Sequence, residues 1–187
     1  MAAAPDTSRI WLTYKARINA ERRLKGYGIL AHLAITWYSF LLIVLGILQS
    51  RIDAASGADA GPLAIILSVL VFGLSLLFYG FRFEERAGQF RECYLKLQRL
   101  WQDEGAALEK LEAYSGILDH YPNHEQRDFD KVIFEGWQRG NQIYNSTGPI
   151  QVTRSLIVRG YTLAFAKWLI IVAAFGWPLI AAAILVA

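Results

Sequence analysis

The sequence predicts an all-α membrane protein, and three long apolar segments carry that prediction. Residues 27–48 and 61–81 contain no Asp, Glu, Lys or Arg, and residues 164–187 contain one charged side chain, Lys167, near their start. An α-helix rises ~1.5 Å per residue, so each segment is long enough to cross a hydrocarbon core of ~30 Å. The composition agrees, because 55% of the residues are apolar and only 19% are charged, below the ~25% of ordinary soluble domains.

The distribution of Lys and Arg predicts the orientation of these segments. Residues 1–26 carry a net charge of +4, whereas the connector 49–60 carries −1. Because Lys and Arg remain on the cytoplasmic side, we expect residues 1–26, a cytoplasmic amphipathic helix, inside and the connector outside. Residues 27–81 then form an antiparallel transmembrane hairpin, 82–163 a cytoplasmic helical domain, and 164–187 a third transmembrane helix. The run 27–48 is longer than the ~7–15-residue core of a cleaved signal peptide.

A heptad pattern follows the second span. Between Phe83 and Leu118, apolar residues recur at alternating spacings of four and three, which predicts one helix that continues out of the membrane and bends at Gly105. Its aromatic members are too bulky for a two-stranded seam, so we expect it to pack on helices of the same chain or of neighbouring subunits. The candidate oligomer contacts are Phe90, Tyr94, Leu97, Trp101, Leu108 and Leu111.

Three further amphipathic segments are predicted to be helical. Residues 7–25 place Ile10, Trp11, Tyr14 and Ile18 on one face, and Asp6 or Thr7 can cap this helix. Residues 125–145 form a second helix that ends at residues 145–149, and residues 152–163 form a third that enters the last span. No alternating pattern of useful length predicts a strand.

The stretch 118–129 (LDHYPNHEQRDF) contains two of the three histidines, His120 and His124, among several acids. Pro122 lies between them and breaks the i, i+4 register that a helical metal site needs. Asn123 suits the N-cap of the next helix, whose positive end favours the acids that follow. A capped helix corner is therefore the favoured interpretation. A metal site built from His120, His124 and Asp128 is the alternative.

Other chemistry has little support in the sequence. The single cysteine, Cys93, allows no intramolecular disulfide and no Cys-based zinc cluster. The chain lacks a glycine-rich phosphate loop and a nucleophile elbow. Residues 82–163 carry a net charge of −1, which is a poor footprint for nucleic acid. We therefore expect no cofactor, no catalytic residue and no direct binding of nucleic acid.

Three motifs, in their order along the chain, resemble the SLATT family. They are Tyr14-Lys-Ala-Arg17 with Glu21-Arg-Arg-Leu24 before the first span, Phe81-Arg-Phe-Glu-Glu-Arg86 after the second, and a corner with Pro122-Asn-His124 and Asp128-Phe129. The similarity extends over about residues 7–145. The third span goes beyond the family's two-span pattern, which leaves open whether the hairpin alone builds a pore.

The resemblance implies a bacterial effector encoded beside nucleotide-signalling and reverse-transcriptase defence genes, and the corner is most similar to the reverse-transcriptase branch. Such proteins are expected to oligomerise and permeabilise the inner membrane during infection. The implied partners are the lipid bilayer, further copies of the chain, and a reverse transcriptase or nucleotide-signal synthase. The implied structural or gating corner, without a catalytic role, comprises Asn123, His124, Asp128 and Phe129.

Polar residues on the first two spans are candidates for a pore wall. They recur on one face of each span, and polar groups in hydrocarbon prefer the bundle interior or water. The candidate pore-lining residues are His32, Thr36, Ser39, Ser68 and Ser75. Hydrogen bonds between helices of a closed bundle are the alternative role for them. One chain has too few spans to enclose water, so a pore requires a ring of subunits.

The predicted function is therefore an oligomeric effector that forms pores or disrupts membranes in bacterial anti-phage defence by abortive infection. A non-conducting membrane scaffold or regulatory subunit that recruits a cytoplasmic partner is the first alternative. A metal-dependent membrane enzyme is the second.

Overall fold

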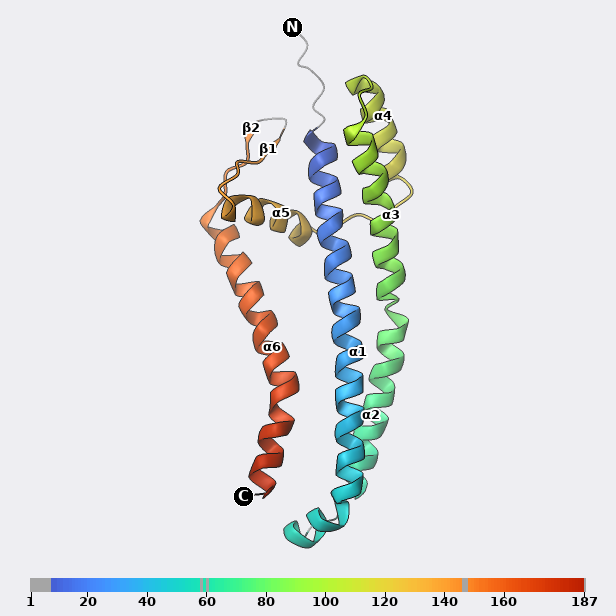
Figure 1. The fold of residues 1–187 in the computed structure, drawn as a ribbon, viewed down its shortest axis with the longest axis vertical. Coiled ribbons are helices and arrows are strands. Elements are labelled where there is room, and N and C mark those ends of the chain that lie inside the picture. Colours follow the sequence, from blue (N-terminus) through green and yellow to red (C-terminus); the bar gives the residue numbers. More distant parts are fainter. Residues whose placement is uncertain (1–7, 58, 60, 146–147, 187) are drawn as a thin grey trace. The chain divides into compact units, whose positions relative to one another are not determined.

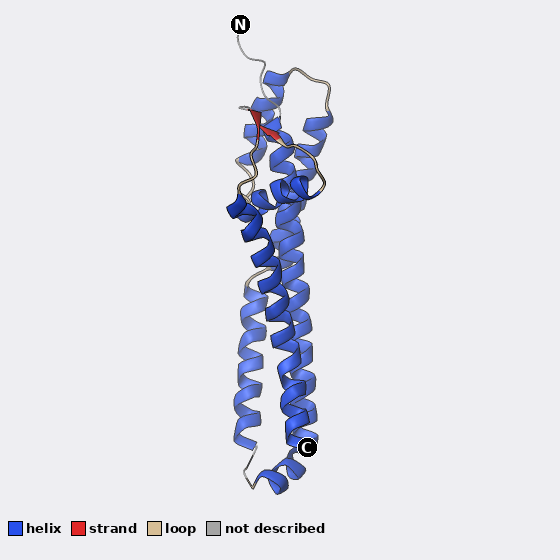
Figure 2. Cartoon of the chain, turned by 90° about the vertical axis from the view of Figure 1, so that its left-hand side faces the viewer, coloured by secondary structure: helices blue, strands red, loops and turns tan. Residues whose placement is uncertain are grey.

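The computed structural model describes residues 8–57, 59, 61–145 and 148–186, and these residues are almost entirely helical (Figure 1). The helices are α1 (Ser8–Ser56), α2 (Gly61–Gly80), α3 (Phe83–Gln102), α4 (Ala107–Leu118), α5 (Gln126–Gln138) and α6 (Arg154–Val186). Two strands of two residues each, β1 (Tyr144–Asn145) and β2 (Gly148–Pro149), complete the described part of the chain (Figure 2). The all-α prediction is confirmed.

Three of the helices are long and apolar enough to cross a membrane. They are α1, α2 and α6. In α2 no residue is buried, and apolar side chains face outward all around it, for example Ile65 and Phe72, which are 65% and 64% exposed. A helix that is apolar on every side must be covered by protein or by lipid. The chain is therefore a membrane protein.

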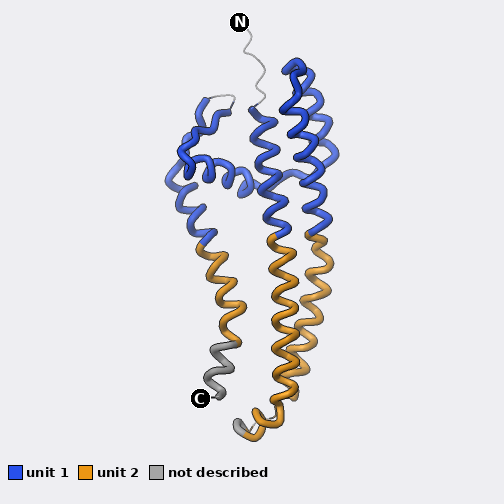
Figure 3. The backbone as a smooth tube through the Cα atoms, in the orientation of Figure 1, with its two compact units in different colours: residues 1–25, 84–164 blue, residues 26–83, 165–187 orange. Residues whose placement is uncertain are grey.

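The chain divides into two compact units (Figure 3). Unit 1 comprises residues 1–25 and 84–164, and unit 2 comprises residues 26–83 and 165–187. Helices α1 and α6 contribute residues to both units. Each unit is described separately below.

Unit 1 is built around the first half of α1. One apolar cluster joins Ile10 and Tyr14 to Cys93 and Leu97 of α3. A second cluster joins Leu12 and Ala16 of α1 to Val132 of α5 and to Ile143. Because α1 is packed on two sides, its polar residues Arg17, Asn19 and Glu21 are buried as well. The predicted apolar face of residues 7–25 is thus only one of two packed faces, and the proposed caps Asp6 and Thr7 lie outside the described residues.

The predicted single helix after the second span is wrong in two places. It is interrupted at residues 81–82, where Arg82 adopts φ = 48°, a left-handed conformation that does not continue a helix. It is interrupted again between α3 and α4, at residues 103–106, where Gly105 was expected only to bend it. The heptad stripe is therefore divided between two helices.

The predicted helix over residues 125–145 ends seven residues early, at Gln138. Gly140 has φ = 72°, and the backbone N–H of Asn141 donates to the carbonyl of Gly136 at 2.9 Å. This is the glycine stop that commonly ends helices. The chain then pairs Tyr144 with Pro149 in a short antiparallel ladder, which no strand pattern predicted. The expected helix before the last span is present as the start of α6.

Candidate functional site

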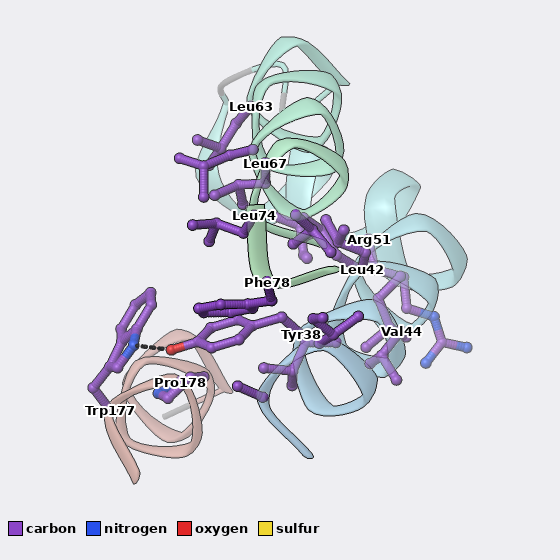
Figure 4. A pocket seen from close by; sticks show the side chains of 18 residues that line it. Tyr38, Leu42, Val44, Arg51, Leu63, Leu67, Leu74, Phe78, Trp177 and Pro178 are labelled. Carbon is purple, nitrogen blue, oxygen red and sulfur yellow. Dashed lines mark hydrogen bonds between the residues drawn. The ribbon is translucent and has the colours of Figure 1, made fainter. Parts of the chain in front are cut away.

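Unit 2 contains an apolar groove of about 920 Å³, within the ~300–1,000 Å³ of typical ligand pockets. It lies between α1, α2 and the Trp177–Pro178 turn of α6 (Figure 4). Its described lining is hydrocarbon apart from Arg51 and from the Tyr38 and Trp177 side chains. Tyr38 of α1 and Phe78 of α2 are among the aromatic side chains that line it (Figure 4). The groove therefore suits acyl chains or apolar side chains better than water.

Pro178 explains one polar contact at this groove. In an α-helix the carbonyl of residue i accepts from the N–H of residue i+4, and proline has no N–H to donate. Pro178 therefore leaves the Ala174 carbonyl without its usual donor. The Tyr38 hydroxyl of α1 donates to that carbonyl at 2.7 Å, and the Trp177 Nε1 in turn donates to the Tyr38 oxygen at 3.1 Å. Membrane helices need such replacement partners because lipid offers none.

None of the five candidate pore-lining residues lines this groove. The Ser68 and Ser75 hydroxyls donate to carbonyls of their own helix, those of Ile65 and Phe72, at 2.8 and 2.7 Å. They thus need neither water nor a second helix. His32 and Thr36 are exposed on the surface of the chain, and Ser39 is half-buried. Any pore wall made of these residues would have to form between chains.

Two of the candidate oligomer contacts are used inside the chain. Phe90 and Leu97 are 4% and 0% exposed, since α1 and α3 pack against each other. Assigning these two residues to contacts between subunits was therefore wrong. Tyr94 and Leu111 are half-buried, and Trp101, 40% exposed, contacts Tyr14. Leu108, 65% exposed, presents the largest apolar surface of the set.

The corner ties α5 to α1 through Asp128. Its carboxylate, 3% exposed, accepts from Nε and Nη2 of Arg23, each at 2.8 Å. The backbone N–H of Glu125 donates to the same carboxylate at 3.1 Å, so Glu125 is the N-cap of α5. The expected N-cap, Asn123, is exposed and lies two residues earlier, so that prediction was wrong. Asn19 of α1 adds a hydrogen bond to the Asp128 backbone carbonyl at 3.2 Å.

The two histidines of the corner do not converge. His120 Nδ1 lies 2.8 Å from the Gly116 carbonyl of α4, whereas His124 is half-buried and its ring stacks with Phe129, with centroids 6.5 Å apart. Burial, and then the charge of Arg17, lowers the pKa of His124, and Asp128 opposes this shift. Among the described residues, no three His, Cys, Asp or Glu side chains are grouped as a metal site requires.

The sequence did not lead us to expect that Arg17 is buried. Its side chain is 0% exposed, and its Nη1 donates to Cys93 Sγ at 2.7 Å. Apolar periodicity named only Ile10, Trp11, Tyr14 and Ile18 as the packed face of residues 7–25. The only sequence signal would have been the spacing of Arg17 from Tyr14 and Ile10, which places all three on one side of the helix.

Comparison with known proteins identifies the family but supplies no relative of established function. No curated protein and no solved structure matches the chain. One family matches residues 6–184, so the match includes α6, which the two-span pattern alone does not contain. The chain thus belongs to the SMODS and SLOG-associating 2TM effector domain family 5, a SLATT family, as its motifs predicted.

Proposed function

We propose that this membrane effector assembles into oligomers that permeabilise the bacterial inner membrane in an anti-phage defence system. The observation that supports this proposal most strongly is that α2 is an apolar helix in which the chain itself buries no residue. The SLATT family's description as a 2TM effector domain supports the same proposal. A single chain encloses no aqueous path in this proposal, because the groove of unit 2 is apolar.

The proposal includes an orientation and a mode of action. Residues 1–26 and 82–163 face the cytoplasm, where the excess of Lys and Arg in residues 1–26 retains them. The chain acts without catalysis, by changing the permeability of the bilayer. A defence partner, such as a reverse transcriptase or a nucleotide-signal synthase, provides the trigger through unit 1.

Dye release from liposomes tests the proposal. Purified protein is reconstituted into vesicles loaded with dyes of graded size, the defence partner is supplied as the trigger, and leakage is expected up to a defined dye diameter. A variant with His32, Thr36 and Ser39 changed to leucine is expected to lose leakage. The matched control changes Ser68 and Ser75 to alanine, and it is expected to leak normally because these hydroxyls bond within their own helix.

Oligomerisation is tested on the most exposed member of the heptad stripe. Leu108→Asp is expected to reduce the oligomer in mild detergent, as measured by light scattering. Leu97→Asp is unsuitable for this purpose, because Leu97 is fully buried in unit 1 and a charge there would unfold the unit. An unchanged oligomer in Leu108→Asp would remove this contact from the proposal.

A non-conducting scaffold is the second candidate. The observation that favours it is the exposed apolar surface of unit 1, where Trp101, Leu108 and Trp137 are 40%, 65% and 41% exposed. Such residues are typical anchors for a protein partner. Absence of leakage at every dye size, with the protein correctly inserted and its partner present, would favour the scaffold.

A further inference from the structure

Arg17 is fully buried in unit 1, yet part of its guanidinium has no partner. Nη1 donates to the Cys93 sulfur, but Nε and Nη2 make no hydrogen bond with the described part of the chain. No ion pair to Arg17 occurs there either. An unpartnered charge is one of the costliest groups to bury. Such a group in a folded protein calls for an explanation, and a bound ion is one of the common ones.

The two free nitrogens form one edge of the guanidinium. Their N–H bonds point the same way and can hold both oxygens of a carboxylate or phosphate at once. Arg23, six residues further along α1, shows this use of the same two atoms: its Nε and Nη2 hold the two oxygens of Asp128, each at 2.8 Å. Arg17 offers the same pair of donors, and no carboxylate of the described chain accepts from them.

A second buried nitrogen without a partner is near Arg17, and it can donate when its ring carries the proton on Nδ1. The Nδ1 of His124 is buried and makes no hydrogen bond with the described residues. The charge of Arg17 acts on the His124 ring, so the two side chains are electrostatic neighbours. Cys93 does not neutralise Arg17, because an ordinary thiol is uncharged at pH 7 and burial disfavours its thiolate. Cys93 therefore leaves the charge of Arg17 uncompensated, and two of its nitrogens still lack an acceptor among the described residues.

We propose that Arg17 and His124 bind a small oxyanion, a phosphate or carboxylate group, inside unit 1. A metal cation is repelled by the guanidinium. Water can accept the N–H bonds but cannot neutralise the charge. An oxyanion does both. Residues 121–125, which include His124, have no helical or strand structure, and Pro122 and Asn123 among them are exposed.

Thermal unfolding of the full chain in detergent tests the site. Tryptophan fluorescence follows unfolding, and Trp11, which packs against both apolar clusters of unit 1, contributes to the signal. Inorganic phosphate and acetate are each compared with chloride at equal ionic strength. A ligand that binds only the folded state raises the melting temperature progressively with its concentration. We expect such a rise with phosphate, with acetate, or with both, and none with chloride. The two oxyanions separate phosphate from carboxylate recognition.

Three variants identify the residues responsible. Arg17→Lys keeps the charge but loses the fork, and we expect its apparent affinity for the oxyanion to fall at least tenfold. Arg17→Met is expected to lose the response completely and, without oxyanion, to be at least as stable as the wild type, because an uncompensated charge is gone. The matched control Arg23→Met is expected to be less stable, since it leaves Asp128 unpaired, while it keeps the oxyanion response.

Three outcomes would overturn the proposal. One is a melting temperature that rises equally with chloride, which indicates ionic strength alone. Another is an oxyanion response that persists in Arg17→Met, which indicates binding elsewhere. The third is a wild-type melting temperature that neither oxyanion raises. A marked loss of stability in Arg17→Met would then indicate a guanidinium satisfied by enclosed water. Membrane leakage does not enter this test, so its result is independent of the proposed effector activity.

Discussion

The Tyr38 hydroxyl is expected to replace the N–H that Pro178 lacks, and this can be tested by removing each group in turn. Tyr38→Phe keeps the ring that lines the groove (Figure 4) but deletes the donor to the Ala174 carbonyl, 2.7 Å away. The carbonyl then has no donor from its own helix, because residue 178 is proline. Pro178→Ala restores that donor through the ordinary i+4 hydrogen bond.

The magnitude follows from the two hydrogen bonds of the hydroxyl. A buried acceptor left unsatisfied costs ~1–3 kcal/mol, and side-chain hydrogen bonds between membrane helices average ~0.6 kcal/mol with a maximum near ~1.7. Tyr38→Phe also removes the weaker bond from Trp177, at 3.1 Å. We expect Tyr38→Phe to destabilise the wild type by about 1–2 kcal/mol. In the Pro178→Ala background only the Trp177 bond is lost, so the cost falls to about 0.6 kcal/mol.

A double-mutant cycle measures the difference between these costs. Free energies of unfolding come from titration with a denaturing detergent in mixed micelles, followed by tryptophan fluorescence. The cycle cancels whatever Pro178→Ala does to the helix by itself. Trp177→Phe is the control, because it removes the second bond without touching the Ala174 carbonyl. An equal cost of Tyr38→Phe in the wild type and in the Pro178→Ala background would refute the reasoning.

Three further perturbations address unit 1, with stability measured by urea or thermal unfolding at fixed detergent. Asp128→Asn removes the buried counter-ion of Arg23 and leaves only Glu125, which is 48% exposed, so it should cost about 3 kcal/mol, the lower end of the range for a broken buried pair. Glu125→Gln removes only the exposed ion pair to the same arginine and should cost at most ~1 kcal/mol. Equal costs would contradict the burial argument. Gly160→Ala places a Cβ 2.9 Å from the Phe134 ring and should cost ~1–3 kcal/mol, while Gly88→Ala, with no atom within 4 Å, should stabilise by ~0.5–1 kcal/mol. The folded-state pKa of His124 lies below its unfolded value, so stability present above pH ~6.5 is lost as the pH falls, by at most ~1.4 kcal/mol per pH unit. In His124→Gln the melting temperature should therefore change less between pH 7.5 and 5.5 than in the wild type. An unchanged slope would exclude this residue as the cause.

The membrane-spanning helices could be predicted because lipid imposes a simple rule. A chain segment in hydrocarbon must satisfy its own backbone and present apolar side chains all around, so uninterrupted apolar length is sufficient evidence. The interruption at residues 81–82 had no such signal. Its positive φ falls on Arg82 rather than on a glycine or asparagine, and apolar spacing continues across it undisturbed.

Two errors in the prediction of α5, in unit 1, had signals that were present in the sequence. Gly140 follows Gln138 by two residues, and a glycine at this place commonly ends a helix. Glu125 and Asp128 have the spacing of a capping box, in which the third residue of the helix returns a hydrogen bond to the cap. Residue preference alone favours Asn123, because asparagine is the more frequent cap. The start and the end of α5 are thus decided by specific hydrogen bonds, which residue preferences alone do not predict.

The burial of Arg17 could not be predicted, because it depends on partners from distant parts of the chain. Periodicity shows which residues share a face, but not how many faces are covered. In unit 1, α3 covers one side of α1 and α5 the other, so a helix that appears amphipathic is enclosed on both. Residues 76 positions apart, Arg17 and Cys93, meet as a result.

The buried polar groups of this chain differ in whether the chain itself provides their hydrogen-bond partners, and that difference supports a ligand at Arg17. The carbonyl freed by Pro178 receives the Tyr38 hydroxyl, and the Arg23 fork receives Asp128. Trp37 Nε1 also lacks a partner, but it is neutral and costs far less to bury than a charge. Arg17 is a full charge at 0% exposure, and its Nε and Nη2 have no hydrogen-bond partner among the described residues. A chain that satisfies Arg23 with its own carboxylate could have satisfied Arg17 in the same way, so the missing carboxylate is best explained by an oxyanion that comes from outside the chain.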